Sequence, residues 1–99
     1  MNPRSEIELC VDILRCIDSG RQKPTHVMYG VNVSWTRSRE IINYLIEREF
    51  IEEKPYKTKR TKRRRVVYSL TPAAQKLLRQ VADLEKVLGK TLGKPEYYL

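Results

Sequence analysis

Acidic residues are absent from a long central part of the chain, and basic residues gather there instead. No Asp or Glu occurs between Glu53 and Asp83, whereas seven of the nine residues from 57 to 65 are Lys or Arg. The 99-residue chain carries a formal net charge of +8 and has a pI of about 9.7. A loop that only has to be soluble usually mixes charges of both signs. A cluster of one sign favours a polyanionic partner such as nucleic acid.

Long apolar runs are also missing from the sequence. A membrane-spanning helix needs roughly 18 consecutive apolar residues, and no stretch of the chain approaches this. The first residues lead into an amphipathic pattern and not into the apolar core of a signal peptide. We therefore expect no membrane association and a cytoplasmic, nucleoid-associated protein.

The chain has too few metal ligands for a zinc site, since His26 is its only histidine and Cys10 and Cys16 are its only cysteines. The six-residue spacing of the cysteines rotates one about 240° from the other on a helix, so they cannot pair within it. Cys10 shares a predicted apolar face with Ile7 and Leu14, which indicates a core position. Cys16 points away from that face, so a thiol at a partner surface or an intersubunit disulfide stays open.

Patterns of catalytic and nucleotide-binding sites are absent as well. The sequence has no glycine-rich phosphate loop, no nucleophile and base at a recognisable spacing, and no paired carboxylates placed for metal-assisted chemistry. We expect no enzymatic activity, no cofactor and no bound metal. Nothing in the sequence indicates a small-molecule ligand.

Capping residues and apolar spacing predict two helices in the first part of the chain. Ser5 and Glu8 have the spacing of a capping box at the start of the first helix, which Gly20 ends. Thr25 is placed to cap a brief second helix that continues to Tyr29. Residues 21–24 form a short connection between the two helices, and Gly30 and Asn32 mark the end of the second. A tight turn is predicted to join this second helix to the next one.

A third helix is predicted from Ser34, its capping residue, to about Glu49. Its expected inward stripe consists of Trp35, Ile42, Leu45 and Ile46. We interpret Trp35, Tyr29 and Tyr44 as packing residues more readily than as contacts with a ligand. The opposite side of the third helix is polar and is expected to be exposed.

Two short strands, residues 50–56 and 66–70, flank the basic segment, which is therefore predicted to form the loop of a hairpin. Thr71 and Pro72 are a strong helix start, a hydroxyl cap followed by proline at the first helical position. The helix predicted from there to Leu88 has an apolar stripe. Its members are Ala74, Leu77, Leu78, Val81, Leu84 and Leu88, and Val87 widens it. Pairing with a second copy explains such a stripe, and packing against the first helix is the alternative.

The order helix, helix, helix, strand, basic loop, strand, helix is that of a winged helix-turn-helix with one additional helix, an α+β fold. Residues 28–35 (Met-Tyr-Gly-Val-Asn-Val-Ser-Trp) and 41–47 (Ile-Ile-Asn-Tyr-Leu-Ile-Glu) carry a further signal. They resemble an archaeal winged helix-turn-helix family with a Met-Tyr, small, Ala-Asn-Leu-Ser-Tyr pattern. The resemblance continues through Phe50-Ile51 and Tyr68-Ser69-Leu70-Thr71. That family includes small dimeric regulators and chromatin-associated proteins whose last helix pairs as a coiled coil.

The chain departs from the family pattern at two positions. Ser38 stands where the pattern prefers leucine, and Glu49 where it often has glycine. The resemblance implies a DNA-binding domain over residues 1–71 and a dimerisation helix with its tail over residues 72–99.

In a helix-turn-helix the second helix of the pair enters the major groove while the preceding one crosses the backbone. The resulting candidates on the recognition helix are Ser34, Trp35, Thr36, Arg37, Arg39, Glu40 and Asn43. Candidates for backbone contacts are Lys23, Thr25 and His26. The wing candidates, which would grip phosphates or enter the minor groove, are Lys57, Lys59, Arg60, Lys62, Arg63, Arg64 and Arg65.

Several functions remain open from the sequence. The leading hypothesis is a homodimeric transcriptional regulator that binds double-stranded DNA at preferred sites. The alternative is a nonspecific architectural protein that coats or bridges duplex DNA with the same wing. A protein-interaction module would leave the basic segment unexplained, and RNA fits a groove-reading helix poorly because its major groove is deep and narrow.

Overall fold

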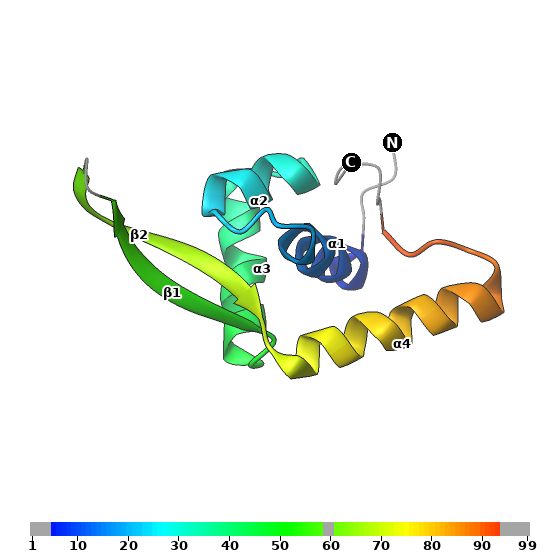
Figure 1. The fold of residues 1–99 in the computed structure, drawn as a ribbon. Coiled ribbons are helices and arrows are strands. Elements are labelled where there is room, and N and C mark those ends of the chain that lie inside the picture. Colours follow the sequence, from blue (N-terminus) through cyan, green and yellow to red (C-terminus); the bar gives the residue numbers. More distant parts are fainter. Residues whose placement is uncertain (1–4, 59–60, 94–99) are drawn as a thin grey trace.

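The predicted winged helix-turn-helix architecture is confirmed by a computed structural model, which describes residues 5–58 and 61–93. Its elements are α1 (Glu6–Asp18), α2 (Pro24–Val31), α3 (Trp35–Glu47), β1 (Ile51–Thr58), β2 (Thr61–Leu70) and α4 (Pro72–Leu88). In Figure 1 the first three helices form the centre of the molecule. The β1–β2 hairpin projects from this centre on one side and α4 on the other.

The predicted caps of three helices are present because each depends on residues that are close in sequence. Ser5 and Glu8 form the capping box of α1, with the side chain of each accepting from the backbone of the other. The Ser34 hydroxyl accepts from the backbone N–H of Arg37 at 3.1 Å and starts α3. Thr71 caps α4 in the same way. Such caps contribute about 1 kcal/mol each.

The start of α2 differs from the prediction. Lys23 is the N-cap residue and Pro24 the first helical residue, so Thr25 lies inside the helix and does not cap it. Proline is favoured at the first helical position because its fixed φ suits a helix. The N–H that proline lacks would have no partner within the helix at this position. The helix ends at Asn32, whose φ of 57° is left-handed.

A left-handed residue also follows α3. Glu49 has a φ of 62°, a conformation that glycine adopts more easily, and this explains why the resembling pattern often has glycine there. The position is held from two sides. Phe50 donates its N–H to the Leu45 carbonyl at 2.9 Å, and the Thr71 hydroxyl donates to the Glu49 carbonyl at 2.7 Å. The end of α3 is thereby joined to the start of α4.

The hairpin is longer than predicted. Antiparallel pairing runs from Ile51 opposite Leu70 to Thr58 opposite Thr61, with a register shift between Tyr56 and Thr58. Most of the segment from 57 to 65 therefore belongs to the two strands and is not loop, as we had expected. Pairing of the two backbones sets the length of these strands. The residue pattern does not show that the strands continue into the basic segment, because Lys is depleted in strands.

The core lies between α1, α2, α3 and the base of the hairpin. Its fully buried members include Ile13, Leu14, Cys16, Val27, Val31, Ile42 and Tyr68. Cys16 is completely buried, and this burial raises the pKa of its thiol to about 11. The option of a surface thiol or an intersubunit disulfide at Cys16 was therefore wrong. Cys10 is only half-buried.

Four apolar residues that we predicted to be inward are exposed. Ile7 is 71% exposed, Tyr29 75% and Tyr44 47%. Trp35 is also half exposed, at 48%. These side chains lie at helix ends or on helix flanks, where spacing along the sequence does not reveal whether a neighbouring element covers them.

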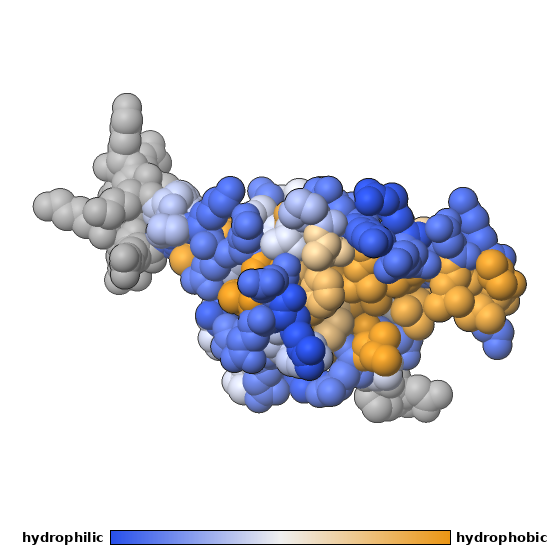
Figure 2. Space-filling view, turned by 90° about the horizontal axis from the view of Figure 1, so that it is seen from below, coloured by the Kyte–Doolittle hydropathy of each residue, from blue (hydrophilic) through white to orange (hydrophobic). Residues whose placement is uncertain are grey.

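α4 packs on the domain with its first half only. Ala74 is fully buried, and Leu77 and Leu78 pack against the core, which agrees with the alternative that this stripe packs back within the chain. Ala74 is thereby removed from the expected dimer interface. Beyond Val81 the stripe emerges, and the apolar surface seen from below reaches the projecting end of α4 (Figure 2).

The segment after α4 is tied back to α1. Arg15 donates to Glu85 at 2.6 Å and to the Leu92 carbonyl at 2.9 Å, and the Leu92 N–H donates to Glu85 at 2.6 Å. Gly93 lies so close to Asp12 of α1 that a Cβ at this glycine would be 2.1 Å from the carboxylate. These contacts hold α1, α4 and the chain after α4 together.

Candidate nucleic-acid interface

The side of α3 that faces away from the core carries the predicted base-contacting residues. Ser38, Ile41 and Leu45 point into the protein, and Thr36, Glu40 and Asn43 are exposed. In Figure 1 the hairpin projects on the side of α3 that is remote from α4. Helix and hairpin can therefore approach one duplex together.

Arg39 is held between α3 and the wing. Its guanidinium donates to the hydroxyl of Tyr68 on β2 and lies 5.7 Å from the centre of the Trp35 ring. Burial raises the pKa of Tyr68, so its hydroxyl stays neutral near pH 7. Guanidinium has five donors in a planar fork, and the hydroxyl takes one. The geometry fixes Arg39 at the edge of the recognition helix that lies next to β2.

Tyr68 was missed by the sequence reasoning, although it was noted as part of the family resemblance. Its contact with Arg39 joins residues 29 positions apart, and helical or strand periodicity carries no information on such a contact. Tyr68 also donates its backbone N–H to the Gln22 carbonyl at 2.8 Å, which ties β2 to the turn before α2.

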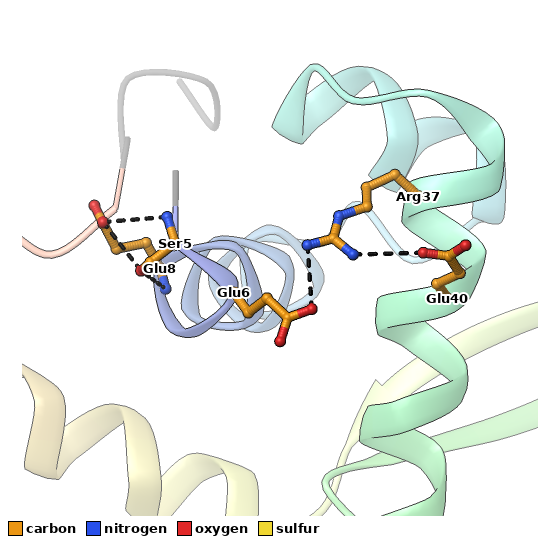
Figure 3. Close-up of polar contacts among 5 residues, drawn as sticks. All are labelled: Ser5, Glu6, Glu8, Arg37 and Glu40. Atoms are coloured by element: carbon orange, nitrogen blue, oxygen red, sulfur yellow. Dashed lines mark hydrogen bonds and ion pairs between the residues drawn. The ribbon is translucent and has the colours of Figure 1, made fainter. Parts of the chain in front are cut away.

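Arg37 points the other way, toward α1 (Figure 3). Its guanidinium lies 3.3 Å from a Glu6 carboxylate oxygen of α1 and 3.4 Å from Glu40 of α3. All three side chains are partly exposed, and such ion pairs contribute little to stability, about 0–1 kcal/mol. The structure therefore separates the two arginines that the sequence placed together, with Arg37 beside α1 and Arg39 beside the wing.

The start of α2 carries the predicted backbone contacts. Lys23, Thr25 and His26 are all exposed, and among the described residues no side-chain hydrogen bond caps the start of the helix. Unpaired N–H groups at a helix start favour an anion such as phosphate. Tyr29 is exposed three residues after His26, on the same side of the helix.

Most of the predicted wing cations lie on the two paired strands. Lys57, Lys62, Arg63 and Arg64 belong to the paired strands, and Arg65, opposite Tyr56, has an exposed side chain. Lys59 and Arg60 lie outside the described residues. The paired strands carry the described part of the basic segment away from the helices (Figure 1).

Of the predicted dimer residues on α4, only those in its far half are largely exposed. Leu84 is 52% exposed and Leu88 61%, and Val87, at 82%, is the most exposed of the three. Leu77, Leu78 and Val81 are partly or fully covered by the chain itself. The spacing of the apolar residues does not show at which residue of α4 the stripe stops packing against the core of its own chain.

Neither a membrane span nor a metal site is found in the part of the chain that the structure describes. No helix there is long and apolar enough to cross a bilayer. No three His, Cys, Asp or Glu side chains among residues 5–58 and 61–93 lie close enough together to hold a metal ion.

Proteins of similar sequence are archaeal and uncharacterised. MJ0290 of Methanocaldococcus jannaschii is 28% identical over 85 residues, which cover 86% of this chain and 36% of that protein. MJ0287 of the same organism is 33% identical over 66 residues, which cover 67% of this chain and 68% of that protein. The chain thus spans little more than a third of the first of these relatives.

Solved structures with the same fold include two mutants of Lactococcus lactis ZitR. One, in its apo form, matches with a TM-score of 0.63 at 21% identity over 85% of this chain and 62% of that one. The other matches with a TM-score of 0.61 at 22% identity over 82% and 54%. The winged helix-turn-helix family model matches residues 3–89. The archaeal resemblance is confirmed, and the chain belongs to the winged helix-turn-helix family.

Proposed function

We propose that the protein is a DNA-binding transcriptional regulator that reads double-stranded DNA with α3 and grips its backbone with the wing. The observation that carries this proposal is the joint presentation of α3 and the basic hairpin. The outward face of α3 is polar and exposed, Arg39 is fixed at its β2 edge, and the hairpin projects beyond it. Membership of the winged helix-turn-helix family supports the same partner.

The residues divide into two roles under this proposal. Arg39 and Asn43 have side chains that can pair bidentately with guanine and adenine edges, and Thr36 suits a thymine methyl or a phosphate. Lys23 and the uncapped start of α2 suit the backbone. Wing cations such as Arg65 suit phosphates or a narrow minor groove. Base preference then depends on α3 and most of the affinity on the wing and α2.

A homodimer is part of the proposal. Three large apolar side chains, Leu84, Val87 and Leu88, remain exposed on the projecting part of α4. Contiguous apolar surface of this kind usually marks an interaction site. A symmetric dimer would present two α3 helices to half-sites about one turn of DNA apart. A protein acting on DNA in this way works in the cytoplasm, at the nucleoid.

Nonspecific architectural binding is the second candidate, and the basic run favours it. Contacts to phosphate carry no sequence information, and the seven cations of the segment 57–65 would supply much phosphate affinity. The two functions share the same residues and differ in how much α3 contributes.

Selection from a randomised duplex pool, at two salt concentrations, separates the two functions. Recovery of a two-fold symmetric motif that persists at the higher salt supports the regulator. Salt-sensitive recovery without enrichment supports the architectural protein. Failure to retain any duplex at the lower salt contradicts DNA binding altogether.

A further inference from the structure

An apolar patch extends over part of one face of the molecule, from its middle to the projecting end of α4 (Figure 2). Its exposed members come from three helices: Ile7 of α1, Tyr44 of α3, and Leu84, Val87 and Leu88 of α4. A monomeric protein rarely leaves so many large apolar side chains in one place uncovered. The surface is wider than a seam along α4 alone.

A groove forms the centre of this surface. It has a volume of about 610 Å³ and runs between α1, α3 and α4. Apolar lining comes from Ile7, Cys10, Leu14, Tyr44, Leu77 and Val81. Leu92, from the segment tied back by Arg15 and Glu85, also lines it. Described residues of α1, α3, α4 and the segment after α4 thus form the groove.

A ridge lies beside the groove. α4 is supported by the core up to Val81, and its last turns, with Leu84, Val87 and Leu88, project beyond the other helices (Figure 1). Leu84 lines the groove of its own chain as well. Groove and ridge are therefore neighbours on one face.

We propose that the groove receives the projecting end of α4 from a second copy of this chain, so that each copy inserts its ridge into the other's groove. This inference rests on the homodimer of the proposed function and names its contact surface. Two-fold symmetry lets one face carry both halves of such an interface. A small ligand in the groove would leave Val87 and Leu88 exposed, and a seam formed by α4 alone would leave Ile7 and Tyr44 exposed.

Charges at the edges of groove and ridge agree with this occupant. The groove edge carries two carboxylates, Glu6 and Glu40, against the single guanidinium of Arg37 (Figure 3). At the projecting end of α4, Asp83 and Lys86 are exposed and Glu85 is paired with Arg15, and Lys90 is exposed just after the helix. An edge with a net negative charge thus meets a helix end with a net positive charge. Opposite potentials of this kind favour the correct register of two surfaces.

The contact would link pairing to DNA reading. Tyr44 and Arg37 belong to α3, the same helix that presents Thr36, Arg39 and Asn43 to a duplex. A partner helix seated against Tyr44 therefore sets the position of one α3 relative to the other. Half-site spacing would follow from this contact and not from the length of α4.

The first test is the mass in solution of Ile7→Lys, measured without DNA over a range of protein concentrations. Ile7 is 71% exposed in one chain and lies outside α4, so its replacement leaves the monomer folded and touches only the groove. The matched control is Gln75→Lys, with the same change of charge at an exposed residue of α4 outside the groove. Circular dichroism checks that both variants keep the wild-type helix content.

We expect wild type and Gln75→Lys to have twice the chain mass of 11.7 kDa. The Ile7→Lys dimer should dissociate at a protein concentration at least tenfold higher than that at which the wild-type dimer dissociates. An Ile7→Lys dimer as tight as wild type would overturn the groove contact, and so would a monomeric wild-type protein. Because no DNA is present, these results leave the DNA-binding proposal standing. Conversely, failure of duplex binding leaves the groove contact standing.

Cross-linking provides a second measurement that does not depend on weakening the dimer. Cys10 lines the groove and Cys16 is buried, so only one native thiol is available there. Under mild oxidation, Val87→Cys or Leu88→Cys should form a disulfide with Cys10 of the other copy, since neither residue lines the groove of its own chain. Adding Cys10→Ser should abolish the cross-linked species. A cross-link that survives Cys10→Ser, or the lack of any cross-link in both variants, contradicts the proposed contact.

Discussion

The guanidinium of Arg39 on α3 is hydrogen-bonded to the buried hydroxyl of Tyr68 on β2. This contact joins α3 to β2 of the wing across 29 positions of the sequence. The centre of the Trp35 ring lies 5.7 Å from the Arg39 guanidinium carbon, which is within the range of a cation–π contact. Arg39 therefore keeps a defined position before any DNA arrives, which reduces the entropy lost on binding.

Tyr68→Phe tests this positioning role. Phenylalanine fills the same core space and removes only the hydroxyl, so the fold should persist. We expect the preference for a selected duplex over a random one to fall by roughly 1 kcal/mol, about fivefold, while affinity for random duplex changes little. Competition binding measures both quantities. An equal loss of affinity for both duplexes would assign Tyr68 a structural role only. Arg39→Ala should lose at least as much preference for the selected duplex as Tyr68→Phe does.

Gly30→Ala should destabilise the fold, because α1 and α2 approach closely at this position. A Cβ on Gly30 would lie 2.6 Å from the Cys16 sulfur and 3.1 Å from Arg21. Overpacking of this kind costs about 1–3 kcal/mol. Urea unfolding measures the loss. Cys16→Ala removes the sulfur that the new Cβ would meet. The double variant should therefore lose less stability than the sum of the losses of the two single variants. A loss equal to that sum would contradict the close approach.

Ser38→Ala should stabilise the protein. Within residues 5–58 and 61–93 the buried Ser38 hydroxyl has no hydrogen-bond partner, and alanine also suits a helix better. We expect a gain of about 1 kcal/mol in the free energy of unfolding. Ser34→Ala is the matched control, since the same chemical change there removes the cap of α3 and should cost about 1 kcal/mol. Changes of equal sign would contradict this reading of Ser38.

Stability should depend on pH through Glu85. The hydrogen bond from Arg15, with a further one from the Leu92 N–H, holds the pKa of this carboxyl below its ordinary value of 4.5. A lowered pKa in the folded state stabilises the fold above the ordinary value, and this stabilisation is lost as pH falls through the folded pKa.

Glu85→Gln should therefore cost roughly 1 kcal/mol at pH 7, and this difference from wild type should shrink below about pH 4.5. Thermal unfolding of both proteins from pH 7 to pH 3 measures it. A difference that stays constant down to pH 3 would mean that the Glu85 charge does not contribute.

Local features of the fold were predictable from the sequence, and contacts between distant residues were not. The caps at Ser5, Ser34 and Thr71 depend on neighbours within three residues, and they were predicted correctly. The inward face of α1 was not: Ile7 is exposed and Cys16 buried, because other elements surround most of this helix. A single apolar stripe cannot be chosen on such a helix by spacing alone.

The same limit applies to the candidate site. Polar positions on α3 follow from its period, yet the opposite directions of Arg37 and Arg39 depend on Glu6 and Tyr68, far away in sequence. The basic run was evident from composition, whereas its place on paired strands required the register of the hairpin. The burial of only the first half of α4 could not be predicted without knowing where α1 lies in the fold.

The salt dependence of duplex affinity tests the central claim, DNA binding through the wing and α3, most directly. If about four to six phosphates are neutralised per subunit, log affinity against log salt should have a slope of roughly −4 to −5 per subunit, and about twice that for a dimer. Alanine at Arg63, Arg64 and Arg65 together should flatten this slope. A slope near zero, or one unchanged by these substitutions, would contradict the account.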